Sequence, residues 1–215
     1  MITDWRMTEV MDVVVDQKAP KNIYIATPGA IWKSDDGGDN WYEADVDIPY
    51  PLFVSRIKID PKDHLKIYAA TDSGLYESRD GGIGWEQKIG DRAEFRDMTW
   101  DKNGTVISVG LQAGNSRKEK KDRKSYNDYV NLWSMLTVGD TIIVAGAEGI
   151  FYASADALPQ SPKNVHSLVK IGNSLFAGSL NGGVWEYDIA KENAMCEVSG
   201  LEKMQVWRLK TVEVK

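Results

Sequence analysis

The sequence predicts an all-β protein made of a repeated four-stranded unit, and three observations agree on this. Of its 215 residues, 42% are hydrophobic, and 8 Trp and 19 Gly accompany many Val, Ile and Tyr residues. That composition is typical of short strands joined by tight turns. An octamer of the form S-x-D-G-G-x-x-W occurs at residues 34–41 and again at 78–85. The match continues upstream, where residues 22–27 align with 66–71 and residues 30–33 align with 74–77.

The second copy of the repeat predicts four strands in succession. They cover residues 54–59, 66–70, 74–77 and 85–88, and Pro61 ends the first because it cannot donate to a strand ladder. A sheet this small cannot bury both of its faces by itself. Stacking such sheets around an axis solves the problem, and the result is a β-propeller.

Weaker copies of the repeat continue to the end of the chain. The second strand of the unit recurs at residues 105–110, 141–146 and 174–179, the last two followed by third strands in 149–156 and 183–188. We therefore predict one propeller domain over residues 1–215, with about five four-stranded blades. Six blades, or a ring completed by another copy, stay open, because 206–210 resembles the first strand of a sixth unit and 4–7 an isolated fourth strand.

The octamer itself predicts a tight turn with a structural role. Its Ser and Asp side chains can accept backbone N–H groups, its second Gly can adopt positive φ, and its Trp can bury a large ring against the hairpin. The residues concerned are Ser34, Asp36, Gly38, Trp41, Ser78, Asp80, Gly82 and Trp85. A calcium site at these carboxylates is disfavoured, because calcium requires six or more oxygen ligands.

The octamer resembles the Asp-box, or BNR repeat, of the propellers in sortilin-like domains, xyloglucanases and photosystem II assembly-factor-like proteins. The resemblance is carried by the run from Ile59-Asp60-Pro61 to Trp85 and implies Asp-box hairpins in at least two blades. It identifies architecture and says little about activity, since the boxes of sialidases lie away from the active site.

Composition excludes several function classes. With 26 Lys+Arg against 32 Asp+Glu the net charge is −6, which argues against nucleic-acid binding. One Cys and two His exclude a disulfide framework and a multi-cysteine zinc site, so neither a metal nor a cofactor is expected. No apolar stretch is long enough to cross a bilayer, and the first residues lack the order of a secretory signal. A cytoplasmic location is the default expectation.

Candidate binding residues follow from aligning the starts of the predicted first strands, which meet at the mouth of the central channel. Core positions come next in the alignment: Val13, Ile57, Met98, Met135, Leu168 and Leu209. The mouth candidates are Asp12, Arg56, Arg96, Asp97, Trp133, His166, Trp207 and Arg208. They can form a binding surface, since Trp and Arg are the usual anchors of interfaces. Alternatively, the charged members pair with one another and line a wet channel.

A basic segment interrupts the third unit. Residues 117–124 contain Arg117, Lys118, Lys120, Lys121, Arg123 and Lys124. Such a segment is either a solvated loop or a docking arm for an acidic partner, phosphate or anionic lipid.

No catalytic set is identifiable. Sialidase chemistry calls for an Arg-Ile-Pro segment, which does not occur, and a carboxylate pair such as Asp12 and Asp97 has no separation fixed by the sequence. The leading hypothesis is therefore a non-catalytic protein-binding or assembly scaffold. The alternatives are a carbohydrate-binding protein or glycoside hydrolase, and a structural component of a virion or other large particle.

Overall fold

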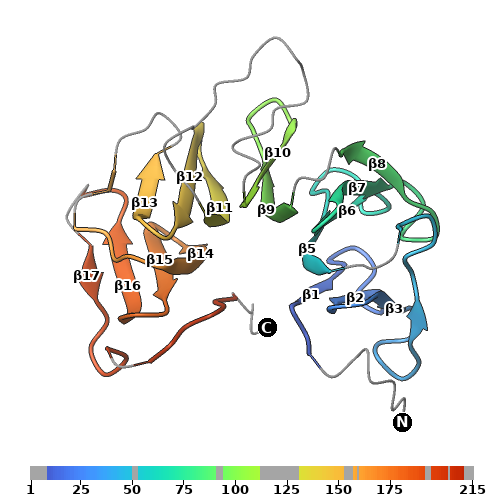
Figure 1. The fold of residues 1–215 in the computed structure, drawn as a ribbon, viewed down its shortest axis with the longest axis horizontal. Coiled ribbons are helices and arrows are strands. Elements are labelled where there is room, and N and C mark those ends of the chain that lie inside the picture. The colour runs from blue at the N-terminus through green and yellow to red at the C-terminus, as the bar shows by residue number, and fades with distance from the viewer. Residues whose placement is uncertain are drawn as a thin grey trace. The chain divides into compact units, whose positions relative to one another are not determined.

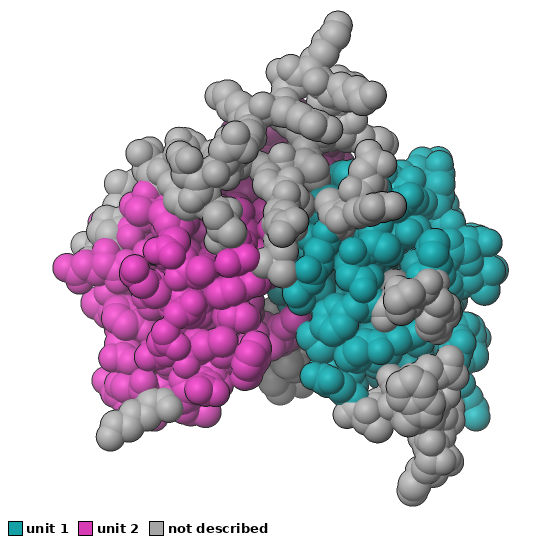
Figure 2. Space-filling view, in the orientation of Figure 1, with its two compact units in different colours: residues 1–97 teal, residues 98–215 magenta. Residues whose placement is uncertain are grey.

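The computed structural model describes residues 9–49, 53–90, 94–111, 131–152, 157–158, 160–191, 195–202 and 204–210. Across these ranges the chain forms 17 β-strands and no helix (Figure 1). The chain divides into two compact units, residues 1–97 and 98–215 (Figure 2), and the division falls inside strand β9.

Unit 1 contains two four-stranded antiparallel sheets. The first blade pairs its strands in the order β1 (Asp12–Val15), β2 (Ile23–Ala26), β3 (Ile31–Ser34) and β4 (Tyr42–Glu43). The second blade has the order β5 (Val54–Ile59), β6 (Ile67–Thr71), β7 (Gly74–Ser78) and β8 (Glu86–Ile89). The apolar core of this unit joins both blades and includes Ile31, Ile57, Ile67 and Trp85.

The remaining strands form three sheets. β9 (Glu94–Trp100) pairs with β10 (Val106–Leu111). The three-stranded blade contains β11 (Leu132–Val138), β12 (Thr141–Gly146) and β13 (Gly149–Tyr152). The last blade contains β14 (Val165–Ile171), β15 (Ser174–Ser179), β16 (Gly183–Asp188) and β17 (Cys196–Glu197). Unit 2 has its own apolar clusters, built around Ile143, Leu175 and Tyr187 and around Val109 and Met135.

The all-β propeller architecture predicted from the repeat is confirmed. Four sheets of three or four strands, each in sequential antiparallel order, form four blades. The strands predicted at 54–59, 141–146, 174–179 and 183–188 have the observed bounds. The prediction of five four-stranded blades is met in part, because the third unit shows only β9 and β10 before residues 112–130, which lie outside the described residues.

One strand prediction is wrong. Residues 206–210 form no strand, because the Val206 N–H bonds to the Ser179 carbonyl but the Leu209 N–H bonds to the Ser167 side chain, so no backbone ladder continues within the described residues. They lie instead in an irregular segment, residues 204–210, which we call the strap. The isolated strand predicted at 4–7 lies outside the described residues, as does the basic segment 117–124.

Candidate functional site

Both octamers fold into the same turn. In the first, Ser34 Oγ accepts the Gly38 N–H at 2.8 Å and donates to Asp36 Oδ1 at 2.8 Å. In the second, Ser78 Oγ accepts the Gly82 N–H at 2.8 Å and donates to Asp80 Oδ1 at 2.7 Å. Each carboxylate then accepts a backbone N–H four residues further on, at 3.0 Å.

The glycines of these turns have the backbone conformation that the octamer predicts. Gly38 has φ 104° and Gly82 has φ 88°, in the region that favours residues without Cβ. The N–H and side-chain amide of Asn40, together with Ser34, lower the pKa of Asp36 to about 2. The N–H of Gly84 and the hydroxyl of Ser78 likewise lower the pKa of Asp80. The carboxylates are therefore committed to closing their own turns.

The two turns differ in what covers them. The Gly81 carbonyl of the second turn accepts Tyr24 Oη at 3.0 Å and Lys33 Nζ at 2.8 Å, both from the first blade. Trp85 donates its indole N–H to the first blade's Ala44 carbonyl at 2.8 Å and is 6% exposed. Trp41 donates to the Gly38 carbonyl of its own turn and is only half-buried. The second turn thus joins two blades, whereas the first closes on itself.

In the alignment of first strands, the second of the two mouth positions forms a repeated tie between adjacent blades. This position holds Asp12, Arg56, Asp97, Ser134, Ser167 and Arg208. Asp12 Oδ2 accepts the Ile57 N–H at 3.2 Å, and Ser134 Oγ accepts the Leu168 N–H at 3.1 Å. Ser167 Oγ accepts the Leu209 N–H of the strap at 2.9 Å. In each case a side chain at the start of one blade holds the backbone of the next inner segment. The strap therefore takes the place of a further inner strand without forming a sheet.

The residues predicted to lie in the core, directly after the mouth positions, are buried in the second, third and fourth units of the repeat but not in the first. Ile57, Met98 and Met135 are buried to 1% exposure or less. Val13 is 39% exposed, so its assignment to the core is wrong. Its counterpart Ile57 is buried because the first blade packs against it.

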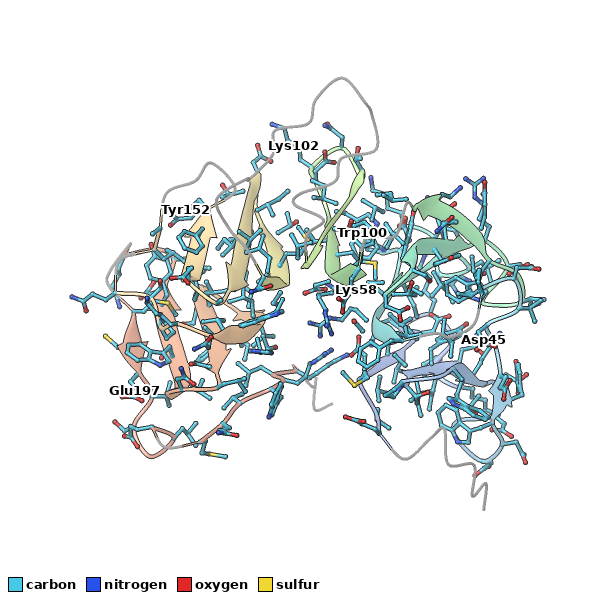
Figure 3. All side chains as sticks on the ribbon, in the orientation of Figure 1. Asp45, Lys58, Trp100, Lys102, Tyr152 and Glu197 are labelled. Carbon is cyan, nitrogen blue, oxygen red and sulfur yellow. The ribbon has the colours of Figure 1, made fainter. Side chains whose placement is uncertain are left out.

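Charged mouth residues of unit 1 form a buried ion-pair cluster. Arg56 Nε lies 3.2 Å from Asp97 Oδ1, and Lys58 Nζ lies 2.9 Å from the same oxygen (Figure 3 labels Lys58). Arg56 and Asp97 are 6% and 2% exposed. Arg96 pairs with Glu94 and lies over the Phe53 ring at 5.5 Å. The charged residues at these positions of unit 1 thus pair with groups of the protein itself.

Aromatic mouth residues gather in unit 2. Trp133 and His166 stack with ring centroids 3.9 Å apart and an interplanar angle of 25°. His166 meets Trp207 edge-on, with centroids 5.0 Å apart and an angle of 72°. Trp207 is 62% exposed, whereas the other two rings are half-buried. We call these three residues the aromatic cluster.

Two β-bulges orient the inner members of the aromatic cluster. The strand register shifts between Leu132 and Ser134 and again between Val165 and Ser167, so that Trp133 and His166 are the extra residues. A bulge bends the strand and re-aims the side chain, and bulges are common beside functional sites. Asn131 and Asn164 precede the two bulged strands with φ 70° and 53°, a conformation that Asn tolerates.

The strap holds the third ring. The Val206 N–H donates to the Ser179 carbonyl at 3.0 Å, and the Gly183 N–H donates to the Met204 carbonyl at 3.0 Å. A Cβ added at Gly178 would lie 2.5 Å from Val206 Cγ1, so the strap fits only against glycine there. Because its backbone is fixed on both sides, Trp207 presents its indole from a defined position.

A histidine–aspartate pair lies at the other end of the first two blades. His64 Nδ1 lies 2.8 Å from Asp16 Oδ2, and the His64 side chain is 36% exposed, so it is paired rather than simply solvated. Burial alone would raise the pKa of Asp16, but His64 and two backbone N–H groups lower it. The pair links the turn after β1 to the turn between β5 and β6.

Three of the predicted mouth residues, Trp133, His166 and Trp207, lie together in the structure, and other residues beside the candidate positions were not predicted. Lys58 completes the ion-pair cluster, and Gly178 makes room for the strap. The run N-[LV]-x-S-[ML] at residues 131–135 and 164–168 is the signal that marks both bulges. Among the described residues, no group of three His, Cys, Asp or Glu side chains is placed to hold a metal ion, and no helix could span a membrane.

Comparison with known proteins shows the fold. No protein-family model matches the chain, and no curated protein sequence matches it. The extracellular domain of BT3049 from B. thetaiotaomicron is similar in structure, with TM-score 0.75, 13% identity, and coverage of 97% of this chain and 30% of that one. An ancestral GH74 enzyme gives TM-score 0.67 and 15% identity, covering 89% of this chain and 31% of that one. YCF48 bound to D1 peptide gives TM-score 0.58 and 14% identity, covering 85% and 66%. The chain thus spans about a third of the first two structures, and the likeness concerns architecture alone.

Proposed function

We propose that this protein is a non-catalytic binding module that recognises a protein partner through the mouth ends of its blades. The observation that carries the proposal is the aromatic cluster, in which Trp207 is 62% exposed on a backbone fixed by hydrogen bonds. Large exposed rings held in place are the usual anchors of protein interfaces, because little side-chain entropy is lost when they are covered. The structural likeness to YCF48 bound to D1 peptide supports a peptide-binding role.

The state of the mouth carboxylates argues against hydrolysis. Asp12 and Asp97 are 3% and 2% exposed, and both are engaged with groups of the protein itself. A general acid or nucleophile must reach the scissile bond. These carboxylates instead stabilise the contact between blades.

The test uses the full chain immobilised as bait. Proteins retained from the source organism's lysate are compared between the wild type, Trp207→Ala and Ile171→Ala. Ile171 is a matched control, because it is 56% exposed and lies at the opposite end of β14 from His166. We expect a partner that Trp207→Ala loses and Ile171→Ala keeps. A partner retained equally by both variants would refute the proposal.

Carbohydrate binding is the second candidate, and the same rings favour it, because an exposed indole can also pack against the apolar face of a sugar. Binding of a glycan should quench tryptophan fluorescence in the wild type and not in Trp207→Ala. A flat response to a glycan panel would remove this candidate.

The finer description of the fold belongs to the same proposal. We propose that the two octamer turns are Asp-boxes, that β9 and β10 begin a fifth blade, and that residues 1–215 form one propeller domain. The identical hydrogen bonds at Ser34 and Ser78 support the first point. The packing of Ile107 and Val109 of β10 with Met135 of β11 supports the second, and the recurring tie at the second mouth position supports the third.

A further inference from the structure

We infer that the aromatic cluster binds a cationic side chain, arginine or lysine, in an extended segment of the partner. This inference rests on the proposed function and names the chemical class of the group that the cluster receives.

Ring geometry is the first argument. Trp133 and His166 stack, whereas Trp207 stands at 72° to His166, so the three rings form a corner with two differently oriented surfaces. Aromatic faces carry negative potential, and Trp binds cations most strongly of the aromatic side chains. Rings set at an angle can contact one cation from two sides, which a flat stack cannot do.

Nearby charge is the second argument. Because Leu132 pairs with Gly146 and Val165 with Ser179, the hairpins after β12 and β15 lie at the same end as the cluster. Glu148 lies in the first hairpin with its side chain 62% exposed, but Lys163 pairs with it at 3.4 Å and offsets its charge. At the second hairpin, Glu202 packs its backbone against Gly183.

Glu202 stays ionised, because the N–H groups of Gly200 and of its own backbone lower its pKa. Arg208, which follows Trp207 in the chain, is half-buried, whereas Trp207 is exposed. The whole chain carries a net charge of −6, which favours the approach of a basic segment.

Fixed geometry is the third argument. Val206 and Leu209, on either side of Trp207, are held by Ser179 and Ser167 at 3.0 and 2.9 Å. The indole is therefore in place before a ligand arrives, and binding does not have to order the strap.

The experiment compares two synthetic nonapeptides of alternating glycine and arginine, one with citrulline in place of every arginine. Citrulline has nearly the shape of arginine and no charge. Binding is followed in the full chain by the indole N–H resonance of Trp207, assigned from the cross-peak that Trp207→Phe removes. We expect the arginine peptide to shift this resonance and to bind at least about five-fold more tightly than the citrulline peptide.

Variants separate cation binding from simple apolar contact. Trp207→Phe should retain part of the affinity, whereas Trp207→Leu, which is apolar without a π face, should lose about ten-fold. Since Trp207→Phe removes the reporter, these variants are compared by calorimetry, with Ile171→Leu as the control that changes nothing.

Equal binding of both peptides, or equal loss in the Phe and Leu variants, would overturn the cation inference. So would binding of neither peptide, or a shift of Trp207 by cello-oligosaccharides only. The proposed function fails separately, when lysate capture shows no partner that depends on Trp207. The two failures are therefore distinguishable.

Discussion

Replacing Gly178 with alanine should displace the strap and move Trp207 away from His166. The new methyl group would lie 2.5 Å from Val206 Cγ1 and 3.2 Å from its Cβ, well inside the ordinary carbon–carbon contact of about 3.5–4.0 Å. Overpacking of this kind costs about 1–3 kcal/mol. The strap is held by a few hydrogen bonds of about 1 kcal/mol each and by the buried side chain of Val206. The energetic cost of the overlap is therefore comparable with the energy that holds the strap in place.

The two histidines make the displacement measurable. The chain has 2 His, so a carbon–proton correlation spectrum of the imidazole groups contains two sets of signals. In the wild type, His166 lies between two indole rings and its signals should be shifted by their ring currents, whereas His64 serves as the internal reference. In Gly178→Ala the His166 signals should move part of the way toward the values of a free imidazole.

A compensating change tests the cause. Val206→Ala removes the methyl groups that the new Cβ would meet and leaves the backbone hydrogen bonds of the strap available. The 2.5 Å overlap disappears but Val206 Cβ stays 3.2 Å from the added methyl group, so the double variant Gly178→Ala/Val206→Ala should move the His166 signals most of the way back to their wild-type positions. An unchanged His166 in the single variant, or no recovery in the double variant, would refute the packing argument.

Three further predictions concern stability and are read from urea unfolding. Asp12→Ala leaves the buried Ile57 N–H without its acceptor and should cost about 1–3 kcal/mol; a cost below 0.5 kcal/mol would contradict the tie between blades. Gly82→Ala should destabilise more than Gly38→Ala, because both have positive φ but only the former would place a Cβ 3.2 Å from the Tyr24 ring; equal losses would count against the packing of the second turn. Burial raises the pKa of Glu77, but hydrogen bonds from its basic and tyrosine neighbours lower it to about 2, so the stability that its charge supplies is present above about pH 4.5 and is lost as pH falls toward 2. Glu77→Gln should therefore be less stable than the wild type by on the order of 2 kcal/mol at pH 7, with a difference that shrinks below pH 4.5; a constant difference across this range would contradict the assignment.

The sequence repeat by itself determined the strands and the two octamer turns. The aligned copies of the repeat, its Gly turns and the octamer are local signals, so they predicted strands 54–59, 141–146, 174–179 and 183–188 with the bounds that the structure shows. The same holds for the positive φ of Gly38 and Gly82, since a Ser–Asp–Gly turn needs only its own hydrogen bonds.

Only the tertiary structure decided which mouth residues are exposed and can contact a partner. The sequence placed Asp12, Arg56, Asp97 and Trp207 in one set, but the first three are buried in contacts between blades and only the last is exposed. Val13 and Ile57 occupy equivalent positions of the repeat, yet a neighbouring blade covers only Ile57. Burial depends on what packs against a residue from a distant part of the chain, and the bulges that aim Trp133 and His166 arise from register between strands. A repeat pattern does not contain the packing of one blade on another, because it describes each blade by itself. The run N-[LV]-x-S-[ML] recurs at both bulges, but its meaning follows only from the strand register.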